Sequence, residues 1–288
     1  MQLRSLLIRL TLVHGLGYQA MTRILKHCVH EHVVITDAGL LGAVAHLSEH
    51  QMTIFMSDWM SESFARRVEK HGVLDTLTIV DADYPLELLA SFKPPLVLFL
   101  KGHRELLAGR KLAVVGARRA TPYAARCVTQ LLTPLVTEQL TVVSGLAAGT
   151  DGCAHQTALD CGLPTIGVIG TGLDQAYPRV NRQLQGRVSK VGLLISEYPL
   201  GAKPARYHFP ERNRIIAGLC QTLVVIEARE HSGSLITANL ALQNGRNVLA
   251  VPGPIDAPLS VGCNQLIAAG AKPVLNSQHI VEEFLPII

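Results

Sequence analysis

The stretch KLAVVGARRATPYAARCVTQLLTPLVTEQLTVVSGLAAG, residues 111–149, decides the fold, because it places one helix between two aliphatic strands. Residues 112–115 and 140–143 are short uncharged runs of Leu, Ala, Val and Thr, as expected of buried strands. Between them Thr121 is a favourable N-cap and Pro122 a favourable first helical residue, which predicts a helix over 121–138. Strand, helix and strand in this order form one unit of a parallel sheet.

The same alternation continues towards the C-terminus. We predict strands at 164–169, 193–196, 222–226 and 248–251, and helices at 149–161, from about 180, from about 211, at 234–244 and at 262–269. The composition agrees, since 48% of the residues are hydrophobic while only 5% are aromatic. The predicted fold class is α/β, with a mainly parallel sheet, helices on both faces, and ligands beyond the carboxyl ends of the strands.

The N-terminal part has a different, all-helical pattern. Apolar residues recur at helical spacing over 3–13 and 18–28, and further helices are expected near 40–47 and 61–70. The connection His14-Gly15-Leu16-Gly17 resembles a helix-hairpin-helix turn, whose N–H groups can bind DNA phosphates, although a purely steric role for the glycines is the favoured interpretation. We predict a small helical domain over residues 1–72 and a larger domain over 73–288.

Composition excludes several classes of protein. The formal net charge of +4 does not by itself identify a nucleic-acid-binding protein. The six cysteines form no C-x-x-C pair, which indicates reduced, mostly buried thiols in a cytosolic protein. No metal site is predicted. An arginine interrupts the apolar N-terminal run, no stretch is long enough to span a bilayer, and a cytoplasmic location is expected.

Polar, glycine-containing loops follow several predicted strands at the edge where such sheets bind ligands. Helix starts in these loops offer N–H groups, and arginines add positive charge, so an anion site is favoured. The candidate residues are Gly116, Arg118, Arg119, Ser144, Gly145, Arg179, Ser232, Gly233 and Ser234. Each loop taken singly has a structural explanation as a turn or a cap.

The segment YHFPERNRIIAG, residues 207–218, adds an arginine cluster with aromatic neighbours. Phe209, Arg212 and Asn213 are candidates for contact with a phosphate chain and a stacked base. Arg214 could serve either the ligand or the fold. Asp151 and His155 lie four residues apart, which permits an acid–base pair, but a helix cap and its partner is the favoured interpretation.

Eight motifs, in order and spacing, resemble the DNA-processing protein A (DprA/Smf) family over about residues 81–271. They are VVGARRATPYA, SGLAAGTDGCAHQTAL, TIGVIGTGLDQAYPRVNRQL, SEYPLGAKP, FPERNRIIAGL, SGSLITANLAL, GRNVLAVPG and GCNQLIAAGA. The resemblance implies an extended Rossmann-like domain after a small sterile-alpha-motif-like (SAM-like) or hairpin domain. A further C-terminal winged-helix domain, present in some relatives, is not expected in this chain.

The resemblance also implies a function. Family members bind single-stranded DNA in natural transformation and help load the RecA recombinase, displacing or coexisting with single-strand-binding protein, without acting as enzymes or using a cofactor. The loop residues named above, with Phe209, Arg212 and Asn213, would form the DNA site. Dimerisation would involve the segment 262–274, with Asn264, Leu266 and Ile267. Ala117 and Ala148 depart from the family pattern, where a hydroxyl residue and a basic residue are usual.

One alternative from another class remains open at this point. A Rossmann-like crevice can bind a free nucleotide, as in nucleoside-monophosphate phosphoribohydrolases, so the chain could be a nucleotide-binding enzyme or sensor. Its acid–base groups would be Asp151, His155 and Glu197. The sequence favours the DNA-binding interpretation, because the arginine segment holds more positive charge than one small phosphate needs.

Overall fold

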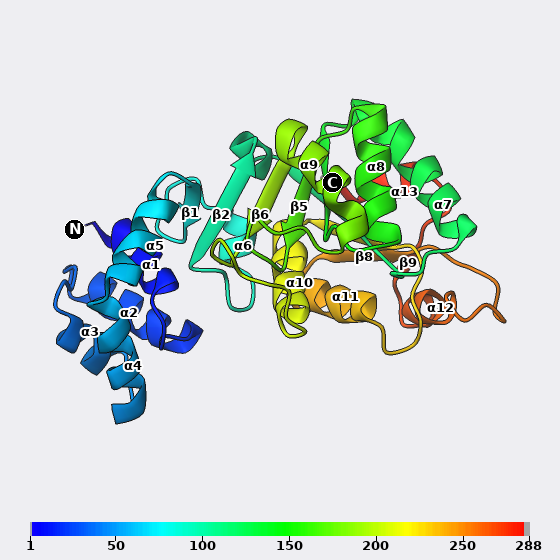
Figure 1. The fold of residues 1–288 in the computed structure, drawn as a ribbon. Coiled ribbons are helices and arrows are strands. Elements are labelled where there is room, and N and C mark those ends of the chain that lie inside the picture. Colours follow the sequence, from blue (N-terminus) through cyan, green and yellow to red (C-terminus); the bar gives the residue numbers. More distant parts are fainter. Residues whose placement is uncertain (1, 285–288) are drawn as a thin grey trace. The chain divides into compact units, whose positions relative to one another are not determined.

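A computed structural model describes residues 2–284 (Figure 1). These residues form two compact units. The first contains the chain up to Tyr84 together with Pro95–Phe99, and the second contains Pro85–Pro94 together with the chain from Leu100 onward. The predicted domain boundary between residues 72 and 73 stays a prediction. Within residues 2–284, no helix combines the length and the apolar character needed to cross a bilayer.

The first unit is mainly helical. Its helices are α1 (Leu3–Leu12), α2 (Tyr18–His30), α3 (Ala38–Val44), α4 (Glu49–Trp59) and α5 (Glu62–Gly72), followed by strand β1 (Asp75–Thr78). Helix α4 was not predicted, since only Phe55 on it is buried and its apolar periodicity is weak. A capping box between Ser48 and Gln51 starts it.

The turn between α1 and α2 has an internal role. Gly15 has φ +90°, a left-handed conformation that favours glycine, and a Cβ there would lie 3.2 Å from the backbone nitrogen of Phe55. The neighbouring N–H of His14 donates to Asp58 Oδ2 at 2.9 Å. These contacts agree with the steric interpretation of this glycine turn.

The second unit contains the predicted alternation of strands and helices. Strand β2 (Val97–Gly102) begins in the first unit and ends in the second. The following strands are β3 (Arg110–Val115), β4 (Leu140–Ser144), β5 (Thr165–Ile169), β6 (Leu193–Ser196), β7 (Thr222–Val225), β8 (Asn247–Ala250) and β9 (Lys272–Pro273). They lie in the order β6-β5-β4-β3-β7-β8-β9, and every neighbouring pair is parallel.

Helices cover both faces of this sheet (Figure 1). Helices α7 (Pro122–Leu132) and α8 (Thr150–Cys161) share one apolar cluster with strands β3, β4, β7 and β8. Helices α10 (His208–Leu219) and α11 (Gly233–Gln243) lie on the opposite face, and Ile215, Ile216 and Leu219 of α10 are buried. The remaining helices are α6 (Leu86–Leu89), α9 (Arg182–Val191), α12 (Val261–Ala268) and α13 (Gln278–Val281). The predicted fold class is confirmed.

Most element bounds agree with prediction, and the differences have local causes. The predicted helix 121–138 ends as an α-helix at Leu132 and continues as 3-10 turns over Thr133–Thr137, because Pro134 cannot donate an N–H. Helix α10 begins three residues before the predicted start at 211. The prediction of free, mostly buried cysteines is confirmed, since all six are free thiols and four of them are buried.

Candidate functional site

A cavity of about 490 Å³ opens at the carboxyl ends of β3 and β7. Three segments far apart in sequence meet there, namely the loop after β3, the loop after β7 and helix α10. Eight of the twelve predicted site residues line it: Gly116, Arg118, Arg119, Arg212, Asn213, Ser232, Gly233 and Ser234. Sequence reasoning missed Ala147, Arg229, Thr237 and Leu259, which also line it.

The sharp turn after β3 depends on small residues. A Cβ on Gly116 would lie 2.5 Å from Thr150 Oγ1, so a larger residue would displace the start of α8. Thr121 caps α7, because its side chain accepts a hydrogen bond from the N–H of Ala124. Helix α11 starts at the cavity, because its first residues Gly233 and Ser234 line it, and the positive end of its dipole favours an anion there.

Two other predicted residues support the site from beneath. Ser144 is fully buried and donates its hydroxyl to the carbonyl of Val114 at 2.7 Å. Gly145 lies directly under Arg212, since a Cβ at that position would come within 1.9 Å of the guanidinium. Neither residue lines the cavity: Ser144 bonds the neighbouring strand, and the missing Cβ of Gly145 leaves room for Arg212.

Two aromatic side chains, Phe209 and Tyr177, continue a line of contacts that begins at Arg118 in the cavity. We call this pair the aromatic ledge. The Arg118 guanidinium lies 5.3 Å from the ring centroid of Phe209, and that ring lies 5.3 Å from Tyr177, which is 43% exposed. Arg179 follows two residues later but lines a separate groove with α9. Tyr177 was not a predicted site residue, although its place in a glycine-rich loop beyond β5 was a usable signal.

The floor of the cavity contains a buried acid and a buried base. Asp151 is 7% exposed and Arg212 is 3% exposed. Burial raises the pKa of Asp151, and the nearby Arg212 charge opposes that rise, while burial lowers the pKa of Arg212. Arg212 donates from Nη1 to the carbonyl of Val168, on strand β5.

Two polar atoms at the cavity lack a partner among the described residues. They are Nε of Arg212 and Oγ of Ser232, both buried and both on residues that line the cavity. Buried polar groups are usually hydrogen-bonded, so unpaired ones at a cavity indicate a ligand or bound solvent. An N–H and a hydroxyl can both donate to a phosphate oxygen.

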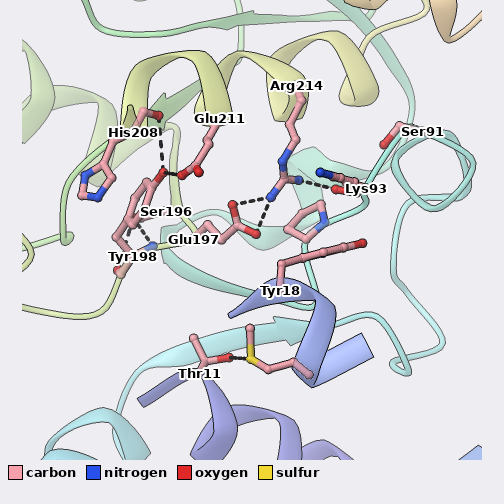
Figure 2. Close-up of polar contacts among 12 residues, drawn as sticks. Thr11, Tyr18, Ser91, Lys93, Ser196, Glu197, Tyr198, His208, Glu211 and Arg214 are labelled. Carbon is pink, nitrogen blue, oxygen red and sulfur yellow. Dashed lines mark hydrogen bonds and ion pairs between the residues drawn. The ribbon is translucent and has the colours of Figure 1, made fainter. Parts of the chain in front are cut away.

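Helix α10 is fixed at two points along its length (Figure 2). Tyr198 donates its hydroxyl to Glu211 Oε2 at 2.8 Å, and its ring stacks on His208 with centroids 3.8 Å apart. Arg214 bonds both carboxylate oxygens of Glu197 and the carbonyl of Lys93. Arg214 therefore serves the fold, and these contacts position Arg212 and Asn213 on the same helix.

The loop that carries Arg118 and Arg119 depends on Glu227, which sequence reasoning missed. Glu227 is 3% exposed at the end of β7 and accepts hydrogen bonds from both the N–H and the hydroxyl of Thr121. The acidic residue in VVIEARE, directly after a buried strand, was the available signal.

We expect Glu227→Gln to lower the free energy of unfolding by about 1–2 kcal/mol, because one of two charge-assisted hydrogen bonds is lost. Urea unfolding measures this change. Glu230→Gln is the matched control, since Glu230 is exposed in the same loop and should unfold like the wild type. Equal stability of the Glu227 variant and this control would contradict the assigned contact.

The nucleotide-enzyme alternative requires Asp151, His155 and Glu197 to act together. Of these three, Asp151 lines the cavity. His155 is fully buried and bonds Thr165 through Nδ1 at 2.8 Å, and Glu197 is held by Arg214. In the described part of the chain, no three His, Cys, Asp or Glu side chains gather as metal ligands would.

Comparison with known proteins decides the family. The model of the DNA recombination-mediator protein A family matches residues 75–285. The chain belongs to this family. The resemblance to DprA/Smf proteins predicted from the motifs is thus confirmed, and the matched region covers every element that forms the cavity.

Individual relatives agree with the family assignment. DNA processing protein DprA of Streptococcus pneumoniae is 43% identical over 246 residues, which are 85% of this chain and 87% of that protein. Its X-ray structure has a TM-score of 0.91 to this one, with 37% identity and 99% of each chain covered. DNA processing protein A of Helicobacter pylori, described for its unique single-stranded DNA binding mode, has a TM-score of 0.66, 28% identity, and coverage of 74% of this chain and 96% of its own.

Proposed function

We propose that this chain binds single-stranded DNA at the cavity between the β3 loop, the β7 loop and α10. The observation that carries the proposal is the convergence of Arg118, Arg119 and the start of α11 on a cavity whose Arg212 and Ser232 have unpaired polar atoms. This arrangement suits a phosphate of a nucleic-acid backbone. The description of the Helicobacter pylori relative supports it.

The geometry favours a single strand over a duplex. An exposed aromatic ledge of Phe209 and Tyr177 beside the cavity can stack an unpaired base without reading its sequence. In a duplex the bases are stacked on each other and unavailable. Backbone N–H groups and arginines follow a flexible phosphate chain, so binding should show little sequence preference and strong salt dependence.

Membership of the family supports a finer assignment, which is part of this proposal. The protein protects incoming single strands during natural transformation and helps load RecA, with single-strand-binding protein as a further partner on the same DNA. It acts as a binding protein in the cytoplasm and not as an enzyme. The separation of His155 and Glu197 from the cavity supports this choice over a nucleotide-cleaving enzyme.

A homodimer through α12 is part of the proposal. Leu266 and Ile267 are partly exposed on this helix and are available for a contact between copies. Asn264 contributes indirectly, because its side chain bonds the backbone N–H and carbonyl of Gly253 and so fixes the preceding loop. Two sites on one particle would hold a longer strand with more avidity.

The proposal is tested with labelled oligo-dT and a duplex of equal length by fluorescence anisotropy over a salt series. We expect the single strand to bind more tightly. Arg118→Gln should weaken binding about tenfold and make the slope of log K against log salt shallower by about 0.7, the contribution of one phosphate contact. Arg126→Gln, an exposed arginine on α7, is the control. Wild-type preference for duplex, or an Arg118 variant equal to the control, would contradict the proposal.

A further inference from the structure

We infer that the single strand continues beyond the cavity onto helix α9, whose exposed basic face forms a second part of the DNA site. This inference rests on the proposed function and extends it to the length of DNA held by one copy of the chain. A groove of about 660 Å³ runs along this face, and Arg179, Arg182, Arg187 and Lys190 line it. We call these four side chains the α9 stripe.

Three of the four charges of the α9 stripe are not used by the fold. Residues 179–191 contain no acidic residue. Arg187 pairs with Asp160 at 3.0 Å, but among the described residues no ion pair or side-chain hydrogen bond involves Arg179, Arg182 or Lys190. Arg182 is also the first residue of α9, where the helix dipole disfavours a cation. These cations are therefore available to an anionic partner.

The groove is also lined by Gly186, and the packing of the protein does not require a glycine at this position. Gly186 lies in the middle of α9, and a Cβ there would meet nothing within 4 Å. Glycine inside a helix is less favourable than alanine, and no neighbour of Gly186 excludes a side chain. A bare backbone between Arg182 and Lys190 lets a ligand approach the helix closely.

A chain of contacts runs from the cavity to Tyr177, which lies two residues before the start of the α9 stripe. Arg118 lines the cavity and covers Phe209, Phe209 packs on Tyr177, and Arg179 begins the stripe two residues after Tyr177. A strand leaving the cavity would thus meet a cation, two rings and further cations in succession. From Arg182 to Lys190 the helix rises about 12 Å, with basic residues on successive turns.

This spacing favours a nucleic-acid backbone over an acidic protein. Phosphates recur along a strand at regular intervals, and a row of Lys and Arg along one helix face is the electrostatic footprint of such a chain. A protein partner would need a buried apolar anchor at the centre of the contact. The groove instead is lined by arginine, lysine, glutamine and glycine, with Val180 as the single apolar side chain among its lining residues.

The test is the double variant Arg182→Gln, Lys190→Gln, titrated with oligo-dT of about four and about twelve nucleotides, within the range of known single-strand sites. We expect unchanged affinity for the short oligonucleotide and about tenfold weaker binding of the long one. For the long one the salt slope should become shallower by about 1.4, because two phosphate contacts are lost. The control is Arg66→Gln, Lys70→Gln on α5, which removes the same charge from two exposed side chains of another helix.

Four other outcomes of this titration would each contradict the inference, and each has a different cause. Wild-type affinity and slope for the long oligonucleotide would remove the α9 stripe from the site. Equal losses at both lengths, or an equal loss in the control, would indicate damage to the cavity or a general charge effect. Loss of poly-glutamate binding with unchanged oligo-dT affinity would assign the stripe to an acidic protein. A wild-type protein that binds neither oligonucleotide would refute the proposed function itself.

Discussion

Arg212→Ala is expected to lower the free energy of unfolding by about 3–5 kcal/mol, more than any other substitution at the cavity. The guanidinium is 3% exposed and donates to the carbonyl of Val168, which would lose this partner. The positive charge of Arg212 is also the largest effect that lowers the pKa of Asp151, and it offsets the rise that burial causes. Removing one member of a buried charged pair leaves the other uncompensated, which is the costly case.

Urea unfolding followed by circular dichroism measures this loss. Arg206→Ala is the matched control, because Arg206 directly precedes the segment 207–218 and is exposed, so this variant should unfold like the wild type. The double variant Arg212→Ala, Asp151→Asn should recover about 1 kcal/mol or more, since the uncompensated carboxylate is gone. A stable Arg212 variant that fails only in DNA binding would show that the arginine acts by direct contact alone.

The burial of Arg212 marks the limit of what the sequence could predict. In YHFPERNRIIAG it is one of four consecutive polar residues before an apolar run, and such a segment is usually exposed. Its burial depends on the carbonyl of Val168 in β5, 44 positions earlier, and on the missing Cβ of Gly145. Contacts between distant segments are absent from local periodicity, so the sequence showed the residue but not its environment.

Local signals predicted the fold well because each element has its own pattern. The Thr121-Pro122 start of α7 was correct, and β6 was placed at its observed bounds, since its short aliphatic run lies between Gly192 and Glu197. The convergence of the loops after β3 and β7 followed from parallel strands ending at one edge. Arg179 lies outside the cavity because β5 is two strands from β3, and the sequence does not contain the strand order.

The neutral state of His155 makes stability depend on pH. This side chain is fully exposed to solvent only when the chain unfolds, since in the folded protein it is buried and bonded to Thr165. Burial lowers its pKa from 6.5 to about 3. Above pH 6.5 the residue is neutral in both states. As the pH falls below 6.5, the unfolded chain takes up a proton that the folded protein cannot, so stability is lost down to about pH 3.

We therefore expect His155 alone to remove about 2 kcal/mol between pH 6.5 and pH 5, since each pH unit corresponds to about 1.4 kcal/mol. Urea unfolding of the wild type and of His155→Gln at several values of pH measures this. The His155→Gln variant should be less stable than the wild type near neutral pH, because the substitution disturbs a buried site. The difference in the free energy of unfolding between wild type and variant should shrink towards pH 5, because only the wild type loses the contribution of His155. His231→Gln, whose histidine side chain is 92% exposed, is the control and should follow the wild-type curve. Parallel curves for wild type and His155→Gln would show that this histidine takes up its proton in the folded protein as readily as in the unfolded chain.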